Sequence, residues 1–204
     1  VQVKKSDIEV RYGTAATREM LEELTTDVVL VAIGAEPIMP KFPGIELENV
    51  SCFTEVYDRM DELGEDICII GGGMVGVEFA VELLERGKKV TIVEMGAEIA
   101  PQGNLLYQAG LHRFLKGFEG KITVKTGTKC MGFTPEGVLV ESKENGQSMI
   151  TCDHAVAAVG MKPKRQEAFD LYGTADETMM FGDCEKVGQV VHATNDAYFI
   201  AANI

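Results

Sequence analysis

Residues 66–94 read DICIIGGGMVGVEFAVELLERGKKVTIVE, and this stretch decides the fold. The run at 67–70 is short and apolar and ends at glycine, which is typical of a strand buried on both faces of a parallel sheet. Gly71, Gly73 and Gly76 then match the spacing G-x-G-x-x-G. In that spacing the first glycine permits a tight turn, the second lets a pyrophosphate approach the backbone, and the third lets helix pack on strand.

The residues that follow strengthen the prediction of a dinucleotide-binding turn. Apolar residues wrap most of the helix expected over 75–84, and Gly87 ends it. The next strand, expected over 90–93, leads into Glu94, close to the roughly 20 residues expected before the acid that binds the ribose hydroxyls. This carboxylate favours NAD over NADP, because it repels a 2′-phosphate and no Lys or Arg follows it in sequence until Arg113.

We expect the backbone of this turn to hold the pyrophosphate at the helix N-terminus, where free N–H groups and the helix dipole favour anions. The expected NAD-binding residues are Gly71, Gly72, Gly73, Met74, Val75, Gly76 and Glu94. A glycine fingerprint alone is weak evidence, so a glycine-rich turn without a nucleotide is the alternative. The agreement of strand, helix and acid argues against it.

The chain also repeats part of itself. Residues 27–37, DVVLVAIGAEP, and residues 153–163, DHAVAAVGMKP, share an acid, an apolar strand, a glycine and a proline at the same spacing. A second echo joins residues 8–14, IEVRYGT, to residues 122–128, ITVKTGT. The second copy is preceded by the glycine fingerprint, whereas the first has no room for one. We therefore expect the chain to be a fragment that lacks an upstream segment.

Loops of the form A-x-G-x-x-P occur at 32–37 and 158–163, and MMFGDC occupies 179–184. Together with the two-copy layout, they resemble the two-dinucleotide-binding flavoprotein reductases. The resemblance implies an α/β fold in which a Rossmann-like parallel-sheet NAD domain is inserted in a partial FAD-binding domain. It implies that Asp183 contacts the ribityl region of FAD, that the Gly34 loop also serves FAD, and that Gly160 passes close to the nicotinamide ribose. Ile33 stands where the family loop usually has threonine.

The fingerprint stretch and the terminal GDCEKVGQVVHATNDAYFIAANI are similar to the C-terminal part of NADH:flavin oxidoreductases related to 2-enoate reductase, 2,4-dienoyl-CoA reductase and trimethylamine dehydrogenase. This implies an NADH-binding electron-input module that passes hydride from NADH to FAD. FMN and a 4Fe–4S cluster are expected only if the parent protein has the upstream barrel of those enzymes. The alternative is a nucleotide-binding module or fragment without turnover of its own.

Glu78 has two interpretations. In similar reductases a glutamate at this position lies near the nicotinamide, which implies a contact with the reacting end of the cofactor. The other interpretation is a solvated acid on the helix face, favoured by the helix N-terminus. The sequence leaves both open.

Composition excludes several other classes. Nineteen basic against 32 acidic residues give a net charge of −13, which argues against nucleic acid and anionic membrane surfaces as partners. No apolar run approaches the roughly 20 residues of a membrane helix. The five cysteines form no C-x-x-C or C-x-x-x-x-C pair, which argues against a redox dithiol and a metal or cluster site. We expect reduced thiols in a cytoplasmic protein, and structural roles for His112, His154 and His192.

Three segments follow from these patterns: a partial FAD-binding domain with a linker over 1–64, an NAD-binding domain over 65–165, and a return to the FAD-binding domain over 166–204. In the outer segments we expect a strand at 8–10, a helix at 17–24, a buried strand at 28–33, a linker at 37–43 and a helix at 191–203. In the middle segment we expect a helix at 104–118 and a sheet completed by residues 122–124, a hairpin around 138–150 and residues 155–159.

Overall fold

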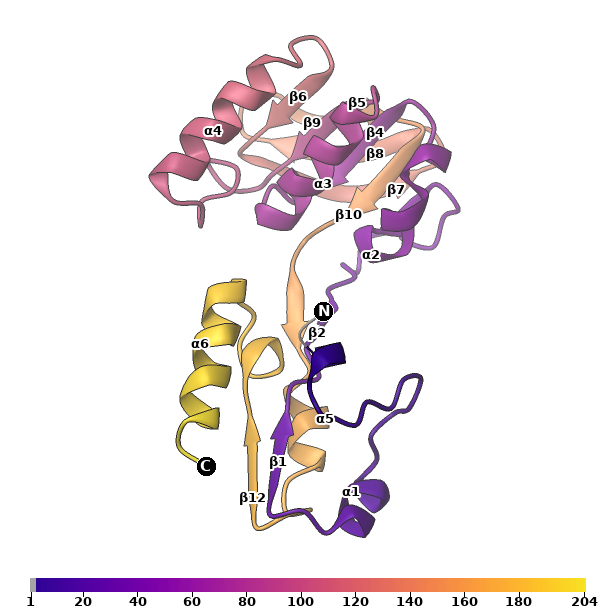
Figure 1. Cartoon of the computed structure of the whole chain (residues 1–204). Helices are drawn as coiled ribbons and strands as arrows, with labels where there is room; N and C mark the ends of the chain where they lie inside the picture. The colour runs from indigo at the N-terminus through magenta and orange to yellow at the C-terminus, as the bar shows by residue number, and fades with distance from the viewer. Residues whose placement is uncertain (1–2) are drawn as a thin grey trace. The chain divides into compact units, whose positions relative to one another are not determined.

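The protein was analysed as a computed structural model, which describes residues 3–204. The chain forms two compact units (Figure 1): a central unit of residues 37–162, and a terminal unit of residues 3–36 and 163–204. Two short strands, β2 (Ala35–Pro37) and β11 (Met161–Pro163), pair where the chain enters and leaves the central unit.

The central unit is built on a five-stranded parallel sheet in the order β3-β10-β4-β5-β6. Its strands are β3 (Val50–Cys52), β4 (Asp66–Ile70), β5 (Lys89–Val93), β6 (Ile122–Lys125) and β10 (His154–Ala157). Because all five strands run the same way, the loops that follow them meet at one edge, where nucleotides bind in open α/β sheets.

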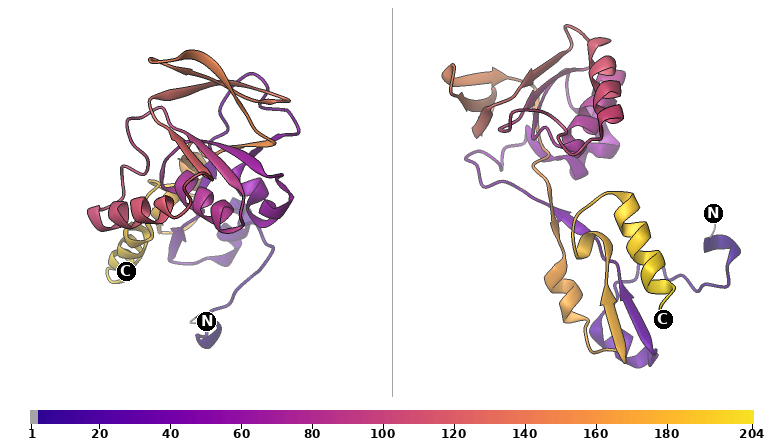
Figure 2. Two further views of the ribbon diagram at one scale, coloured as in Figure 1. Left: turned by 90° about the horizontal axis from the view of Figure 1, so that it is seen from above. Right: turned by 90° about the vertical axis from the view of Figure 1, so that its left-hand side faces the viewer.

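The two faces of this sheet are covered differently. Helices lie on one face and a three-stranded antiparallel sheet lies on the other, as the right-hand view of Figure 2 shows. The helices are α2 (Phe53–Val56), the 3-10 helix η2 (Tyr57–Glu62), α3 (Met74–Glu85) and α4 (Leu105–Lys116), and the small sheet consists of β7 (Thr128–Thr134), β8 (Gly137–Ser142) and β9 (Gly146–Thr151). Along β4, Ile67 and Ile69 pack on the helices while Cys68 and Ile70 pack on the small sheet, as strand alternation requires.

Most predicted elements of the central unit are confirmed. The expected strand, helix and strand around the fingerprint are β4, α3 and β5, and the helix expected over 104–118 is α4, capped by Asn104. The hairpin is also present, with Val138 opposite Ile150. It does not complete the large sheet, however, because it pairs with β7 in a sheet of its own. The last strand of the large sheet ends at Ala157 rather than at residue 159.

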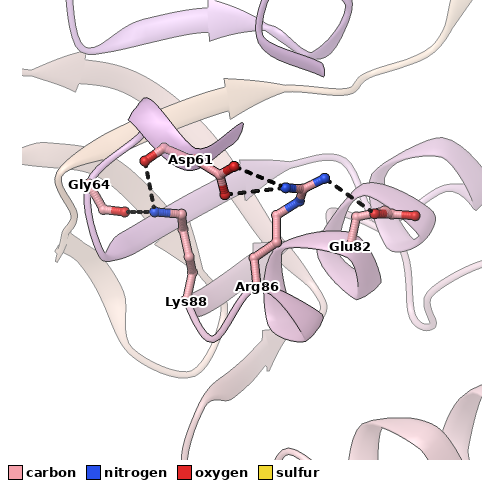
Figure 3. A network of polar contacts seen from close by, with 5 residues as sticks. All are labelled: Asp61, Gly64, Glu82, Arg86 and Lys88. Atoms are coloured by element: carbon pink, nitrogen blue, oxygen red, sulfur yellow. Dashed lines mark hydrogen bonds and ion pairs between the residues drawn. The ribbon is translucent and has the colours of Figure 1, made fainter. Parts of the chain in front are cut away.

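A polar network fixes the far end of α3 (Figure 3). The Arg86 guanidinium donates to both carboxylate oxygens of Asp61 at 3.2 Å and lies 4.0 Å from the Glu82 carboxylate. The buried Lys88 donates from Nζ to the carbonyl oxygens of Gly64, at 2.6 Å, and Asp61, at 3.4 Å. These contacts hold the C-terminal end of α3 against η2, at the edge of the sheet opposite to the glycine turn.

The terminal unit has a smaller sheet and a smaller core than the central unit. It contains the 3-10 helix η1 (Val3–Lys5), α1 (Arg18–Leu24), α5 (Arg165–Asp170), the 3-10 helix η3 (Gly182–Cys184) and α6 (Val190–Ala201) around a parallel pair, β1 (Val28–Val31) and β12 (Glu177–Met180). Its buried cluster consists of Val29, Val31, Ala168 and Cys184. The expected helices at 17–24 and 191–203 correspond to α1 and α6, and α6 buries none of its residues.

Three expectations are corrected. Residues 8–10 form no strand and their side chains are exposed, because no described strand lies beside them to complete the hydrogen bonds. The strand expected over 28–33 ends at Val31 and is buried on one face only, since Leu30 is 39% exposed. The boundaries at 64/65 and 165/166 also differ from the division of the structure, because β3 pairs with β10 and brings residues 37–64 into the central unit.

The segment 37–43, which we expected to be a linker, belongs to the central unit. Phe42 packs against the core between the two sheets, and the carbonyl oxygen of Pro43 accepts a hydrogen bond from the Phe133 backbone N–H at 2.8 Å. The boundary between the units lies at the start of this segment, between residues 36 and 37, and the segment itself packs within the central unit.

Candidate dinucleotide-binding site

The glycine turn after β4 is shaped by backbone contacts that leave no room for side chains. Gly71 has φ +111°, and a Cβ there would overlap the carbonyl of Ala158, the residue that follows β10. A Cβ at Gly76 would overlap the carbonyl oxygen of Gly71, so this glycine lets α3 lie directly on the turn. The sequence predicted these two roles, and the structure confirms them.

Gly73 is different because the space around it is open. It is the N-cap residue of α3, with φ −67°, and a Cβ there would meet no atom within 4 Å. The first backbone N–H groups of a helix have no partner within the helix, and Gly73 has no side chain to accept from them. The open space therefore lies where an anionic group has donors and a helix dipole to meet it. The residues present fit a pyrophosphate.

Glu94 is held against this turn. Its Oε2 accepts a hydrogen bond from the Gly72 backbone N–H at 2.6 Å, and its Oε1 accepts one from the Gly96 N–H at 2.6 Å. A Cβ on Gly72 would lie 2.9 Å from the Glu94 Cβ and 2.8 Å from Ile99, so Gly72 is required for this approach. Each carboxylate oxygen keeps a second lone pair that can accept from a hydroxyl group. The sequence predicted the acid but not its direct bond to the turn.

Tertiary structure also brings lysines to the loop that follows Glu94. Lys125 ends β6 opposite Val93, and its carbonyl oxygen accepts from the Glu94 backbone N–H at 2.9 Å. Residues 95–97, which follow Glu94, line a cavity of about 920 Å³ together with Lys125, Lys129 and Lys143. The sequence prediction considered only the residues that follow Glu94 in the chain, and the fold adds these three lysines to the cavity beside residues 95–97.

The two loop glycines of the repeat adopt related conformations. Gly34 has φ +75° and Gly160 has φ +120°. The Gly160 carbonyl accepts from the Ile38 N–H at 2.9 Å, and the Gly34 carbonyl accepts from the Lys164 N–H at 3.3 Å. A Cβ on Gly34 would meet nothing within 4 Å, and one on Gly160 would meet only Ile38, at 3.7 Å. Positive φ explains both glycines, and the open space beside them is compatible with a ligand.

In the terminal unit, Asp183 lies in η3, just after β12. It is half-buried, and its Oδ1 accepts from the Gly188 N–H at 3.1 Å. The Gly34 loop follows β1, the parallel neighbour of β12. Both predicted FAD-contacting positions thus lie at the carboxyl edge of one sheet.

Glu78 projects from the second turn of α3 and is exposed. It lines a groove of about 710 Å³ between helices, together with Phe53, Phe79, Tyr107 and Phe114 among others. Partial burial raises the pKa of the Tyr107 phenol, and the negative charge of Glu78 adds to this effect. Both interpretations of Glu78 stay open.

His154 has a partner that the sequence did not reveal. Its Nε2 lies 3.0 Å from Ser51 Oγ, across the β3–β10 pair. Burial lowers the pKa of the imidazole, and the charge of Arg59 contributes. His154 is the first residue of β10, whereas the glycine turn lies at the opposite, carboxyl edge of the sheet. The pair therefore joins two strands and does not belong to the nucleotide site.

Within residues 3–204, no cluster of three His, Cys, Asp or Glu side chains is arranged to hold a metal ion. No helix among the same residues combines the length and apolar character needed to cross a bilayer.

Known proteins share this architecture and sequence. NADH oxidase of Thermoanaerobacter brockii is 32% identical over 213 aligned residues, covering 100% of this chain and 32% of that protein. Cinnamate reductase of Clostridium sporogenes is 32% identical, covering 99% of this chain and 30% of its own length. The structure of a 2-naphthoyl-CoA reductase complex matches with a TM-score of 0.92 and 25% identity, covering 100% of this chain and 31% of that one.

The chain therefore spans about a third of the length of the relatives it matches. The family model for pyridine nucleotide-disulphide oxidoreductases matches residues 1–181, which is most of the sequence. Its match includes the glycine turn, Glu94 and both repeat loops. On this sequence and structural agreement, the chain belongs to the pyridine nucleotide-disulphide oxidoreductase family.

Proposed function

We propose that this chain is the NADH-binding, electron-input part of an FAD-dependent oxidoreductase. The observation that carries the proposal is the open space at Gly73, bounded by the N-terminus of α3 and by a Glu94 carboxylate already fixed to the turn. Phosphate charge and ribose hydroxyls have complementary groups there.

Each residue then has a stated task. The backbone from Gly71 to Gly76 holds the pyrophosphate, and Glu94 accepts hydrogen bonds from the adenosine ribose. The Gly160 loop, at the same edge of the sheet, leaves space for the nicotinamide ribose. Bound NADH supplies a hydride and FAD accepts it, while the protein aligns the two rings. No acid or base from this chain is required.

The terminal unit supplies the other part of the proposal. Gly34 and Asp183 lie after neighbouring parallel strands, in the arrangement expected for contacts with FAD. The relatives are about three times as long as this chain. We therefore assign the rest of the FAD site to a further segment of the parent protein. FMN and a 4Fe–4S cluster belong to the proposal only if that segment includes a barrel, and the five free thiols fit a cytoplasmic location.

A nucleotide-binding module without turnover is the second candidate. It is favoured by the contrast between a complete glycine turn in the central unit and a two-stranded sheet in the terminal unit. For the purified chain we expect NADH to bind in a fluorescence titration, with little flavin absorbance and little NADH consumption, which both candidates predict when the rest of the FAD site lies in a further segment. The parent protein separates them: NADH should reduce its bound FAD if this chain is an electron-input part, and should bind without reducing flavin if it is a module without turnover. Stoichiometric FAD with rapid NADH oxidation would show that the flavin site is complete in this chain.

Two substitutions locate the binding site. Gly73→Leu fills the open space in front of α3, and we expect NADH affinity to fall by at least about 100-fold, or nearly 3 kcal/mol. The matched control is Gly110→Leu in α4, where a Cβ also meets nothing within 4 Å. Asp183→Ala should leave NADH affinity unchanged because it serves the other cofactor. Unaltered NADH binding by Gly73→Leu would contradict the proposed site.

A further inference from the structure

The loop between β5 and α4 contains a buried alanine in a backbone conformation that side-chain-bearing residues rarely adopt. Ala100 has φ +46° and is fully buried. Among the described residues, the other non-glycine residue with positive φ is Thr25, at the exposed end of α1, where a left-handed residue commonly ends a helix. Ala100 lies outside any helix. A left-handed alanine persists only where its surroundings hold it, so the contacts of Ala100 indicate what it does.

Both backbone polar groups of Ala100 have partners. Its N–H donates to the Gly72 carbonyl oxygen at 2.6 Å, and its own carbonyl oxygen accepts from the Gly103 N–H at 2.9 Å. The half-buried Gln108, on α4, donates from its amide Nε2 to the same Ala100 carbonyl oxygen and to the carbonyl oxygen of Ile99, the latter at 3.3 Å. The Gln108 side chain therefore connects α4 to the residue that contacts the glycine turn.

Gly72 is fixed through both of its backbone polar groups. Its N–H donates to Glu94 Oε2, and its carbonyl oxygen accepts from Ala100. This carbonyl shares a planar peptide with the Gly73 N–H, and in a trans peptide the two groups point in opposite directions. The bond from Ala100 thus sets the direction of the N–H of Gly73, the residue whose open space we assign to the pyrophosphate.

We propose that Gln108 is a positioning residue for nucleotide binding, which keeps Ala100 left-handed so that Ala100 keeps the Gly72–Gly73 peptide aligned for phosphate. This role rests on the proposed NADH site and adds to it a side chain from another helix. Without the Gln108 amide, the loop can relax toward negative φ at residue 100, and the turn is then aligned in only a fraction of the molecules. The apparent dissociation constant for NADH rises by the inverse of that fraction.

The first test titrates NADH against the full chain and its variants by fluorescence. We expect Gln108→Ala to weaken NADH binding by roughly fivefold to tenfold, which is what one hydrogen bond contributes. His112→Ala, at an exposed position one turn further along α4, is the matched control and should leave the affinity unchanged.

A second substitution separates positioning from a general effect on α4. Glycine adopts positive φ without the steric cost that alanine has, so Ala100→Gly should restore NADH binding in the Gln108→Ala background to within about twofold of the unaltered chain. A side chain that only stabilised α4 would give no such rescue, because Ala100 is not part of that helix.

Amide hydrogen exchange tests the loop in the absence of NADH. The Ala100 N–H should exchange faster in Gln108→Ala than in His112→Ala, because its bond to the Gly72 carbonyl oxygen opens more often. Equal exchange in the two variants, equal NADH affinity, or failure of Ala100→Gly to restore binding would each overturn the role of Gln108 and leave the proposed NADH site standing. Absence of NADH binding by the unaltered chain would overturn the proposed function and this role together.

Discussion

The central and terminal units contain the same short repeat but differ in how much structure surrounds it. In the central unit, strand β10 lies between β3 and β4 in a five-stranded sheet that is covered on both faces. Among the described residues of the terminal unit, the corresponding strand β1 pairs only with β12, beside a cluster of four buried residues. Both repeats end in a glycine loop, but only the central one has a glycine turn and helix beside it.

This difference shows what the repeat contributes. The loops at Gly34 and Gly160 have positive φ and open space beside them in both units. Open space alone does not bind phosphate, which needs hydrogen-bond donors. Those donors are the free backbone N–H groups at the N-terminus of a helix that follows a neighbouring strand. The central unit supplies that helix as α3. In the proposed site, the repeat therefore provides one wall and the glycine turn provides the phosphate-binding part.

The largest expected effect comes from the packing of α3 on its turn. Gly76→Val places a Cβ 2.0 Å from the carbonyl oxygen of Gly71, so we expect the central unit to lose about 3 kcal/mol of stability or more. Urea unfolding followed by circular dichroism measures this loss. Gly110→Ala in α4, where an added Cβ meets no atom within 4 Å, should instead stabilise by roughly 0.5–1 kcal/mol. Equal stability of the two variants would mean that α3 can move off the turn.

The choice between the two nicotinamide cofactors should give the next effect. We expect NADH to bind more tightly than NADPH by roughly 2–4 kcal/mol, or about 30- to 1000-fold, because Glu94 accepts from the ribose hydroxyls and repels a phosphate. Isothermal titration measures both constants. Glu94→Gln should reduce the ratio to about tenfold or less, whereas Glu98→Gln, exposed in the same loop, should not change it.

If the unaltered chain binds NADH and NADPH equally well, the lysines of the neighbouring cavity must offset the repulsion between Glu94 and the 2′-phosphate. In that case, Lys125→Gln and Lys129→Gln should weaken the binding of NADPH but not that of NADH.

A smaller effect is expected at the far end of α3. Lys88→Met removes the donor to the Gly64 and Asp61 carbonyl oxygens and should cost about 1–3 kcal/mol. The adjacent Lys89, which is 62% exposed and lies 3.5 Å from the Asp66 carboxylate, provides the matched control. Lys89→Met should change stability by no more than about 0.5 kcal/mol. NADH affinity should be unchanged in both variants, since the network lies away from the turn. A loss of NADH affinity in Lys88→Met alone would show that contacts at the C-terminal end of α3 affect binding at its N-terminal end.

The smallest effect is a pH dependence at His154. Its pKa is lowered in the folded chain, mainly by burial, so the unfolded chain binds a proton more readily. The contribution of the neutral imidazole is present above the unfolded pKa of about 6.5 and is lost as pH falls below it. Urea midpoints measured from about pH 8 down to 5 should therefore fall more steeply for the unaltered chain than for His154→Gln. If the urea midpoints of the two proteins fall in parallel with pH, His154 has the same pKa in the folded and unfolded chains, and the prediction is wrong.

The sequence by itself determined the glycine turn, α3, β5 and Glu94, because each depends on residues that follow one another closely. A tight turn, a close helix contact and an acid at the end of the next strand are set by backbone sterics and spacing within one βαβ unit. The two glycine loops were predictable for the same reason, since the positive φ of Gly34 and Gly160 is a local property.

Only the tertiary structure decided which distant residues meet. It brought β3 onto the sheet beside β10, Ser51 to His154, and Lys125 to the end of β5. It also left residues 8–10 without a strand partner, although their sequence matches residues 122–124, which pair with β5. A strand forms only where a neighbour completes its hydrogen bonds, and the identity of that neighbour depends on the path of the whole chain.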